Sequence, residues 1–325
     1  MIIKDKIYGE FVISDKVLIE LIKSPPLLRL KKMSNSGIPD RYYHHKGFSR
    51  YEHSLGVMIL LRKFGAGLEE QIAGLLHDVS HLAFSHVADW IFADGGDRPD
   101  NNEEFADRIF EKFIKKTEIT KILEKFNFSV KRISHKDYFS LLERKIPDLC
   151  VDRIDYALRE SRYLWKLNLG ILKNYLKNLV SLNGEIVFTE PKIAFDFAER
   201  FLEMQTKHWG GYEATIRYYL FSQALKQSLK KKIILKKDFF KEEEFILKKL
   251  EKSNNKEIKE ILNLLKKKKI SKIKRNSQKK IYKKFRYVDP KVLVDGDLLR
   301  LSKINPSFQK IIDKHREINK KGFII

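Results

Sequence analysis

The most restrictive feature of the sequence is a run of fifteen residues, Leu75 to Asp89, that concentrates ionisable side chains among apolar ones. The run contains three of the chain's nine histidines and two aspartates, which are His77, His81, His86, Asp78 and Asp89. The apolar neighbours predict that it lies in or beside a core, where ionisable groups are costly to bury unless each has a partner or a metal ion. An adjacent His-Asp pair can offer a nitrogen and an oxygen to one cation.

The local pattern predicts a helix that is capped by Ser80 and continues through Trp90. His86 and Asp89 are three residues apart and would share one face of that helix, within hydrogen-bonding reach. The plainer interpretation is a pair of structural histidines near a helix end. A His-Asp dipeptide alone does not decide between the two interpretations.

Two distant segments carry further side chains that could bind a metal. Upstream, residues 49–57 place His53 at the start of an amphipathic helix. Downstream, residues 148–159 predict another amphipathic helix. Its polar residues share one face and are Asp152, Asp155, Tyr156 and Arg159. The order along the chain is therefore His, then His-Asp, then Asp.

This order of motifs resembles the HD-domain phosphohydrolases, and specifically the branch that contains bacterial dGTPases and the mammalian sterile-alpha-motif/HD-domain dNTP triphosphohydrolase. The resemblance covers roughly residues 1–230. It rests on four motifs in the family's order, which are Arg50-Tyr51-Glu52-His53-Ser54-Leu55-Gly56-Val57, His77-Asp78-Val79-Ser80-His81, Phe84-Ser85-His86 and Val151-Asp152-Arg153-Ile154-Asp155-Tyr156.

The resemblance implies a single divalent metal ion held by four residues, which are His53, His77, Asp78 and Asp152. Two imidazoles and two carboxylates suit Mn, Fe, Co, Ni or Zn better than Mg alone, although Mg can accompany a nucleotide substrate. Four protein ligands leave positions for water and a phosphate oxygen, so the ion can activate water for attack on phosphorus. The alternative is a buried ion-pair cluster that holds no metal.

The resemblance also implies roles in turnover and substrate binding. His81 matches a histidine that lies near the phosphates, and His86 with Asp89 matches a pair implicated in proton transfer. The aspartate would fix the tautomer of the imidazole and raise its basicity. Core hydrogen bonding is the alternative for these three residues. The predicted substrate contacts are Arg50, Tyr156 and Arg159.

Two departures from the family pattern bear on function. The related triphosphohydrolases carry a further active-site histidine in a His-Glu pair, whereas this chain has Asn102-Glu103 at the corresponding place. The family's later nucleotide-binding helix has no convincing counterpart in residues 207–212. Tyr156 does match a tyrosine that selects against ribose. Metal-assisted phosphate chemistry is therefore better supported than any particular substrate.

Composition sets further bounds. The chain has 325 residues, of which 43% are hydrophobic, as is typical of a folded protein. Its single cysteine, Cys150, excludes an internal disulfide, and apolar neighbours indicate a packing role. The start of the chain lacks the apolar stretch of a signal peptide, and the apolar runs are too short to cross a membrane. We therefore expect a cytoplasmic protein without membrane contact, and a homo-oligomer.

The formal charge of +23 invites a nucleic-acid interpretation. Many lysines pair with glutamate at helical spacing, which favours an ordinary solvated surface over most of the chain. The lysines between Lys266 and Lys284 form an expected exposed segment with few interleaved aromatic residues. Weak, nonspecific nucleic-acid binding is the most that we expect from them.

We predict a mostly α fold, with an HD-domain core over residues 1–235 and a small Lys-rich α+β region over residues 236–325. The smaller elements that we expect are strand pairs at 1–13 and 179–188, short helices at 117–126 and 135–144, and a strand at 285–294.

The sequence thus favours a metal-dependent phosphohydrolase that acts on a (deoxy)nucleoside triphosphate or a related nucleotide. One alternative hydrolyses another phosphomonoester or a phosphodiester. A second alternative, from a different class, is a catalytically weakened HD protein that binds nucleic acid or regulates another process. The intact ligand set opposes this second alternative, whereas Asn102 favours it.

Overall fold

The computed structural model describes residues 1–92, 105–270 and 280–324. Over these residues the chain is mostly helical with a few small sheets, which confirms the predicted fold class. Asn102 and Glu103, and the lysines within residues 271–279, lie outside the described residues. None of the described helices is both long and apolar enough to span a lipid bilayer.

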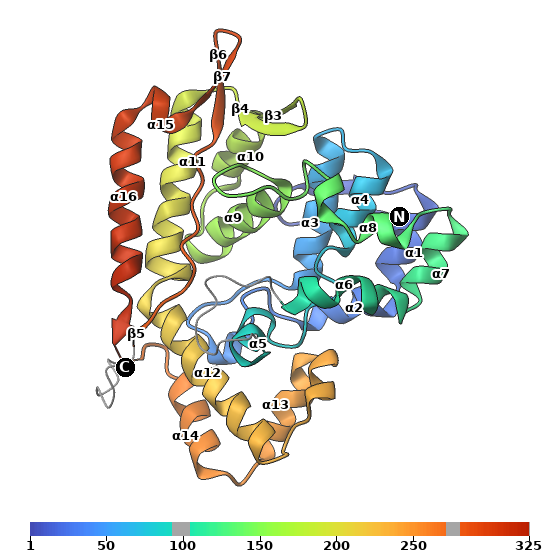
Figure 1. Cartoon of the computed structure of the whole chain (residues 1–325), viewed down its shortest axis with the longest axis vertical. Helices are drawn as coiled ribbons and strands as arrows, with labels where there is room; N and C mark the ends of the chain where they lie inside the picture. Colours follow the sequence, from blue (N-terminus) through green and yellow to red (C-terminus); the bar gives the residue numbers. More distant parts are fainter. Residues whose placement is uncertain (93–104, 271–279, 325) are drawn as a thin grey trace.

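Three helices at the centre of the fold position the site (Figure 1): α3 (Arg50–Lys63), α4 (Leu68–Leu76) and α9 (Val151–Leu164). Helix α3 packs on both of the others. It begins at a capping box, in which Ser49 Oγ accepts from the Glu52 N–H and the Glu52 carboxylate accepts from the Ser49 N–H. Helices α3 and α9 approach closely because α3 carries Gly56, where a Cβ would lie 2.0 Å from Asp155 Oδ1.

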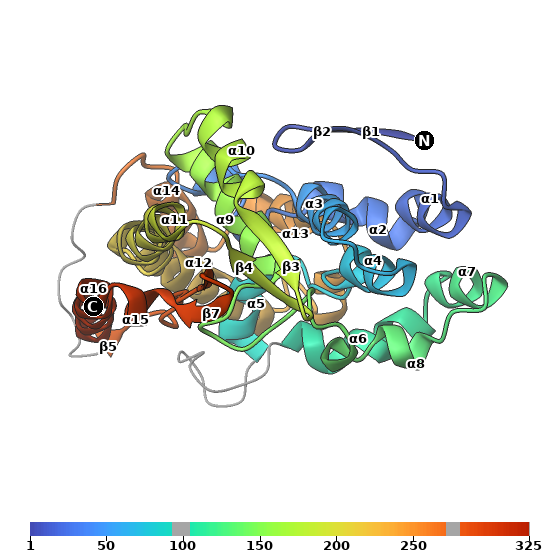
Figure 2. The ribbon, with the colours of Figure 1, turned by 90° about the horizontal axis from the view of Figure 1, so that it is seen from above.

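The N-terminal residues form the predicted strand pair. Strand β1 (Ile2–Asp5) runs antiparallel to β2 (Gly9–Val12), and Figure 2 shows this pair along one edge of the molecule. Further elements lead from it to α3, namely α1 (Lys16–Lys23), α2 (Pro25–Arg29), and the short 3-10 helices η1 (Leu30–Lys32) and η2 (Asp40–Tyr42).

The helix predicted to start after Ser80 begins later, as α5 (Ser85–Phe92), and the residues before it form turns. Phe84 has a left-handed φ of 68°, which interrupts a helix. Its side chain is fully buried against the rings of Phe221 and Phe239. Burial of this ring by distant residues therefore overrides the local helical pattern.

Short helices connect α5 to α9, and they are α6 (Phe105–Lys115), α7 (Ile119–Lys125), α8 (Val130–Ile133) and the 3-10 helix η3 (Lys136–Tyr138). The helix predicted over residues 135–144 is wrong, because only η3 forms there. The Glu70 carboxylate accepts hydrogen bonds from the backbone N–H groups of Leu141 and Leu142. These bonds hold the segment as a loop beside the site.

After α9 and α10 (Leu169–Lys177), the predicted hairpin forms from β3 (Leu179–Leu182) and β4 (Glu185–Phe188). Its turn residues, Asn183 and Gly184, both have positive φ, as a tight type I′ turn requires. The later helices are α11 (Pro191–Met204), the π-helix η4 (Gln205–Trp209), α12 (Tyr212–Lys230), the 3-10 helix η5 (Lys236–Phe240), α13 (Glu243–Lys252) and α14 (Lys256–Leu265).

The C-terminal strands extend the earlier hairpin. Strand β6 (Lys291–Val294) lies parallel to β4, and β7 (Asp297–Arg300) pairs with β6, so the order is β3-β4-β6-β7. The strand predicted over residues 285–294 is therefore shorter than expected. The remaining elements are β5 (Lys280–Ile281), which pairs with β8 (Phe323–Ile324), and α15 (Leu301–Ile304) and α16 (Pro306–Lys321), which pack on α11 (Figure 1).

Apolar residues from the C-terminal part join both hydrophobic clusters of the fold. Val292 and Phe308 belong to the cluster that contains α3 and α9, and Ile281 belongs to the cluster around α12. The C-terminal residues therefore share their packing with the helical core. The boundary at residue 235 stays a prediction.

Candidate metal centre and substrate cavity

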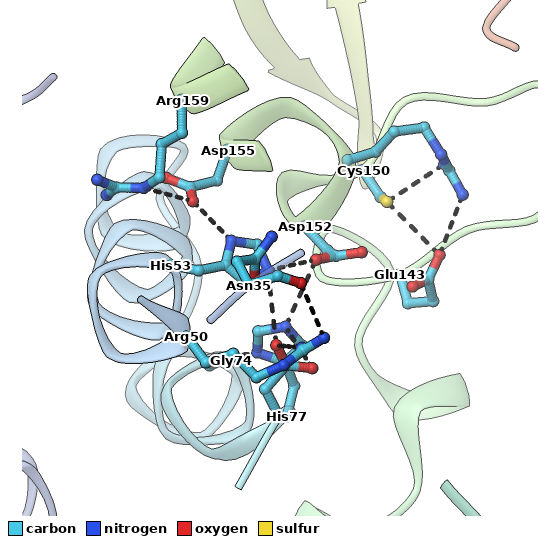
Figure 3. Close-up of polar contacts among 12 residues, drawn as sticks. Asn35, Arg50, His53, Gly74, His77, Glu143, Cys150, Asp152, Asp155 and Arg159 are labelled. Atoms are coloured by element: carbon cyan, nitrogen blue, oxygen red, sulfur yellow. Dashed lines mark hydrogen bonds and ion pairs between the residues drawn. The ribbon is translucent and has the colours of Figure 1, made fainter. Parts of the chain in front are cut away.

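The four predicted metal ligands converge from three segments, and Figure 3 shows how His53, His77 and Asp152 face one another. His53 and Asp152 project from the first turns of α3 and α9, and His77 and Asp78 directly follow α4. His53 Nε2 lies 2.8 Å from Asp152 Oδ1, and His77 Nε2 lies 3.4 Å from the same oxygen. Asp78 Oδ1 is 3.4 Å from His77 Nε2. All four side chains line one cavity.

His53 is held between two carboxylates (Figure 3). Its Nδ1 lies 2.7 Å from Asp155 Oδ2, so Nδ1 donates to Asp155 and Nε2 faces Asp152. This arrangement is the one in which a metal-binding imidazole is oriented by a carboxylate behind it. Burial acts to lower the pKa of His53, but its hydrogen bonds to Asp152 and Asp155 outweigh burial and raise the pKa to about 10. The site therefore attracts positive charge strongly.

The hydrogen bonding of His77 indicates whether these residues fit a metal ion. Its Nδ1 lies 2.7 Å from the Gly74 carbonyl oxygen and donates to it, which leaves a lone pair on Nε2. Among the described residues, that buried nitrogen has no hydrogen-bond partner. It faces the carboxylates of Asp78 and Asp152, which are also acceptors. A divalent cation satisfies several acceptors that face one point, so the residues fit a metal that prefers nitrogen and oxygen ligands.

Asp78 is also in contact with two residues predicted to bind phosphate. The Arg50 guanidinium pairs with Oδ2, and His81 Nε2 lies 3.1 Å from Oδ1. Burial acts to raise the pKa of Asp78, but the positive charge of Arg50 dominates and holds the pKa well below its usual range. Arg50 and His81 both line the cavity beside the predicted metal ligands, and their contact with a substrate stays a prediction.

The predicted proton-transfer pair lies on α5. His86 Nδ1 is 3.4 Å from Asp89 Oδ2, and the His86 side chain is one-third exposed, at the cavity wall. The His86 ring lies 5.5 Å from the His81 ring, measured between centroids. The structure thus brings His86 near the metal ligands, while its role in turnover stays a prediction.

Arg159 has a different position from the one that the sequence suggested. Its side chain is fully buried behind His53, where it pairs with Asp155 at 2.8 Å (Figure 3). It also pairs with Asp5 at 2.7 Å. It does not line the cavity. The expected substrate contact is therefore replaced by a positioning role, because Arg159 holds the carboxylate that orients His53.

This buried charge cluster predicts a large loss of stability in Arg159→Met. Removing Arg159 leaves the buried Asp5 carboxylate without its counter-charge and leaves Asp155 with His53 and Tyr8, and such changes typically cost ~3–5 kcal/mol in the free energy of unfolding. Denaturant unfolding of the two proteins measures the difference. The matched control is Arg200→Met, which breaks a half-exposed pair with Asp196 at the same helical spacing and should cost less than about 1 kcal/mol. Equal effects of the two changes would contradict the assignment.

The metal ligands open into a cavity of about 1090 Å³. Its cationic lining comes from distant segments and comprises Arg50, Lys136, Arg144, Lys145, Arg153, Lys283, Lys284 and Arg286. Besides the predicted ligands, acidic residues line it as well, and they are Asp107, Asp137, Glu143, Asp148 and Glu160. Lys136 pairs with Asp107 and Arg153 pairs with Glu143, so part of the positive charge is already balanced. Its aromatic lining comprises Tyr43, Tyr156, Trp209 and Tyr218. Cationic side chains suit phosphate oxygens, and aromatic faces suit a nucleobase.

Most of this lining was missed by sequence reasoning. Lys283 was expected in an exposed lysine segment, but it is half-buried, with Nζ 3.5 Å from the centre of the Tyr218 ring. Trp209 lies in the segment 207–212, which had no convincing family counterpart, yet it lines the cavity and packs edge-on against Tyr156. In the sequence, the only indication of a binding site at these positions was that aromatic residues lie next to basic ones.

Comparisons with known proteins agree with this site. The HD domain family model matches residues 50–159, which contain all four ligands. The chain is 34% identical to the Bacillus subtilis protein YdhJ, described as uncharacterized, over 100% of this chain and 98% of that one. It is 37% identical to the metal-dependent phosphohydrolase cns2 of Cordyceps militaris, over 51% of this chain and 47% of that protein.

Two more distant likenesses point the same way. The chain is 25% identical to a deoxynucleoside triphosphate triphosphohydrolase SAMHD1 homolog of Dictyostelium discoideum, over 59% of this chain and 42% of that protein. A solved phosphohydrolase from Bacteroides thetaiotaomicron shares the fold, with a TM-score of 0.58, 17% identity, and coverage of 82% of this chain and 76% of that one.

Fold and site thus define an α-helical hydrolase of the metal-dependent class that cleaves phosphate esters or anhydrides. The chain belongs to the HD-domain phosphohydrolase superfamily.

Proposed function

We propose that the protein hydrolyses a nucleotide, with a (deoxy)nucleoside triphosphate as the favoured substrate. The observation that carries this proposal is the joining, in one cavity, of the metal ligands, a cationic wall and an aromatic wall. A phosphate chain would be bound by the metal ion and the cationic wall, and a nucleobase would stack on the aromatic wall. A simple phosphomonoester would use only part of this lining.

The residues divide into three roles in this proposal. His53, His77, Asp78 and Asp152 would hold a divalent ion such as Mn, Fe, Co, Ni or Zn. When bound, such an ion polarises a phosphoryl oxygen and lowers the pKa of water. Arg50 and His81 would bind the phosphate next to the ligands. His86, oriented by Asp89, would hold a proton for the leaving oxygen.

The substrate is tested with a panel of dNTPs, NTPs, nucleoside monophosphates and cyclic nucleotides, each with Mn, Co, Ni or Mg. The proposal expects the highest kcat/KM on a triphosphate. Faster cleavage of a monophosphate would favour the phosphomonoester alternative. An absence of turnover in protein that retains its metal would favour the regulatory alternative, for which the exposed lysines of residues 266–269 offer a salt-sensitive nucleic-acid contact.

Lys283 gives a prediction that is specific to the cationic wall. Burial and the neighbouring Arg286 hold the pKa of Lys283 well below its usual range, so we count its contact to phosphate as an ordinary hydrogen bond of ~0.5–1.5 kcal/mol. Lys283→Gln removes this contact, so KM for a triphosphate should rise roughly 2–10-fold. Steady-state kinetics measure the change. The matched control is Lys280→Gln, which alters an exposed lysine of the same segment and should leave KM unchanged. An unchanged KM in Lys283→Gln would remove this residue from the substrate site.

A further inference from the structure

We propose that His44, His45 and His208 bind a second transition-metal ion, at a site separate from the four ligands described above. His44 and His45 lie in the loop that follows η2, and His208 lies in the π-helix η4. The three imidazoles can each present one nitrogen so that these atoms lie within 4.8 Å of one another. They account for three of the nine histidines in the chain.

The contacts between the rings bring nitrogens of all three imidazoles close together. His44 Nε2 lies 3.2 Å from His208 Nδ1, and His45 Nε2 lies 3.1 Å from His208 Nε2. The ring of Tyr43 packs against all three imidazoles, with centroid distances of 4.4 to 6.0 Å. His208 is buried, so the cluster is sheltered on the side of η4.

Hydrogen bonds do not satisfy all of the ring nitrogens in the cluster. A chain from His44 to His208, from His208 to His45, and from His45 to the Lys46 carbonyl would use most of the ring nitrogens. It leaves His44 Nδ1 buried without a hydrogen-bond partner among the described residues. Glu160 Oε2 is also without one there, and it lies 3.7 Å from His208 Nε2 as a further oxygen beside the cluster.

The chemistry of this site differs from that of the first. A set of imidazoles without a bound carboxylate suits Zn, Cu, Fe or Ni, whereas the mixed nitrogen and oxygen set also accepts Mn. An ion there would tie the loop of His44 and His45 to η4. Helix η4 also carries Trp209, so the ion would fix one wall of the cavity while leaving the four catalytic ligands untouched.

Titration of metal-free protein with Co(II) tests this inference, with the visible absorption of the protein-bound ion as readout. We expect the wild type to bind two equivalents of Co(II) per chain. His208→Ala should bind one equivalent, and so should His44→Asn, which changes the loop and not η4. Asp152→Ala should also retain one equivalent, and its spectrum should be that of the imidazole site. The matched control is His135→Ala, an exposed histidine outside both clusters, which should retain two.

A single equivalent in the wild type, or two equivalents in both His208→Ala and His44→Asn, would overturn the second site. Loss of the second equivalent in His135→Ala would also overturn it, because binding would then be nonspecific. These outcomes do not depend on turnover, so failure of the second site can be told apart from failure of the proposed substrate.

Discussion

Replacing His77 by alanine is expected to remove the catalytic metal and to lower turnover by at least about 100-fold, since even changes behind a metal ligand weaken metal affinity by ~10–100-fold. The reason is geometric. His77 Nε2 is a buried nitrogen that has no hydrogen-bond partner within residues 1–92, 105–270 and 280–324, and it faces both Asp78 and Asp152. Without His77, the two carboxylates still face each other across the site, but an ion bound there has one nitrogen ligand fewer. Metal content per chain and kcat, measured on the same preparations, check the result.

The control for this experiment is His135→Ala, because His135 is an exposed histidine that lies away from the cavity. It should retain wild-type metal content and kcat. Asp152→Ala should behave like His77→Ala, because Asp152 Oδ1 faces both imidazoles. Equal metal occupancy in His77→Ala and wild-type protein would falsify the assignment of the ligand set.

His86→Ala is expected to lower turnover by ~10²–10⁴, which is the usual contribution of a positioned general acid. Metal content should stay at the wild-type value, because His86 lies on α5 and is not one of the four ligands. The loss should be larger for a poor leaving group than for an activated aryl phosphate, whose departing oxygen needs little protonation. Steady-state kinetics on both kinds of substrate give this comparison.

Asp89→Asn is the companion change, because it keeps the size of the side chain but removes the charge beside His86 Nδ1. It should lower turnover less than His86→Ala and shift the pH dependence of kcat. If His86→Ala loses the same small factor on both substrates, or loses metal, then His86 has only a structural role.

The convergence of the predicted metal ligands could be expected because each lies in a motif at or next to a helix end, while their binding of a metal ion stays a prediction. The packing of α3 against α4 and α9 then brings His53, His77 and Asp152 together. The helix boundary at Ser80 was wrong because no local pattern shows that Phe84 is buried by Phe221 and Phe239. Packing against residues that are distant in the sequence therefore determines the turn at Phe84.

The substrate wall could not be predicted for the same reason. Lys283 lies 131 positions beyond Asp152 in the sequence and reaches the cavity through pairing and packing of the C-terminal segments. In a lysine-rich composition, a lysine that binds substrate looks like one that is merely solvated. Arg159 shows the reverse error, since a motif residue proved to be a buried support for His53 rather than a surface contact.

The distance in sequence between ligands and wall has a consequence for synthesis of the protein. Ribosomes add ~5–20 residues per second, so the segment 283–286 emerges roughly 7 to 27 s after Asp152. During that interval the nascent chain already contains the four predicted ligands and much of the cavity lining, but it lacks Lys283, Lys284 and Arg286. The cavity therefore gains its last cationic side chains only after residue 286 has been added.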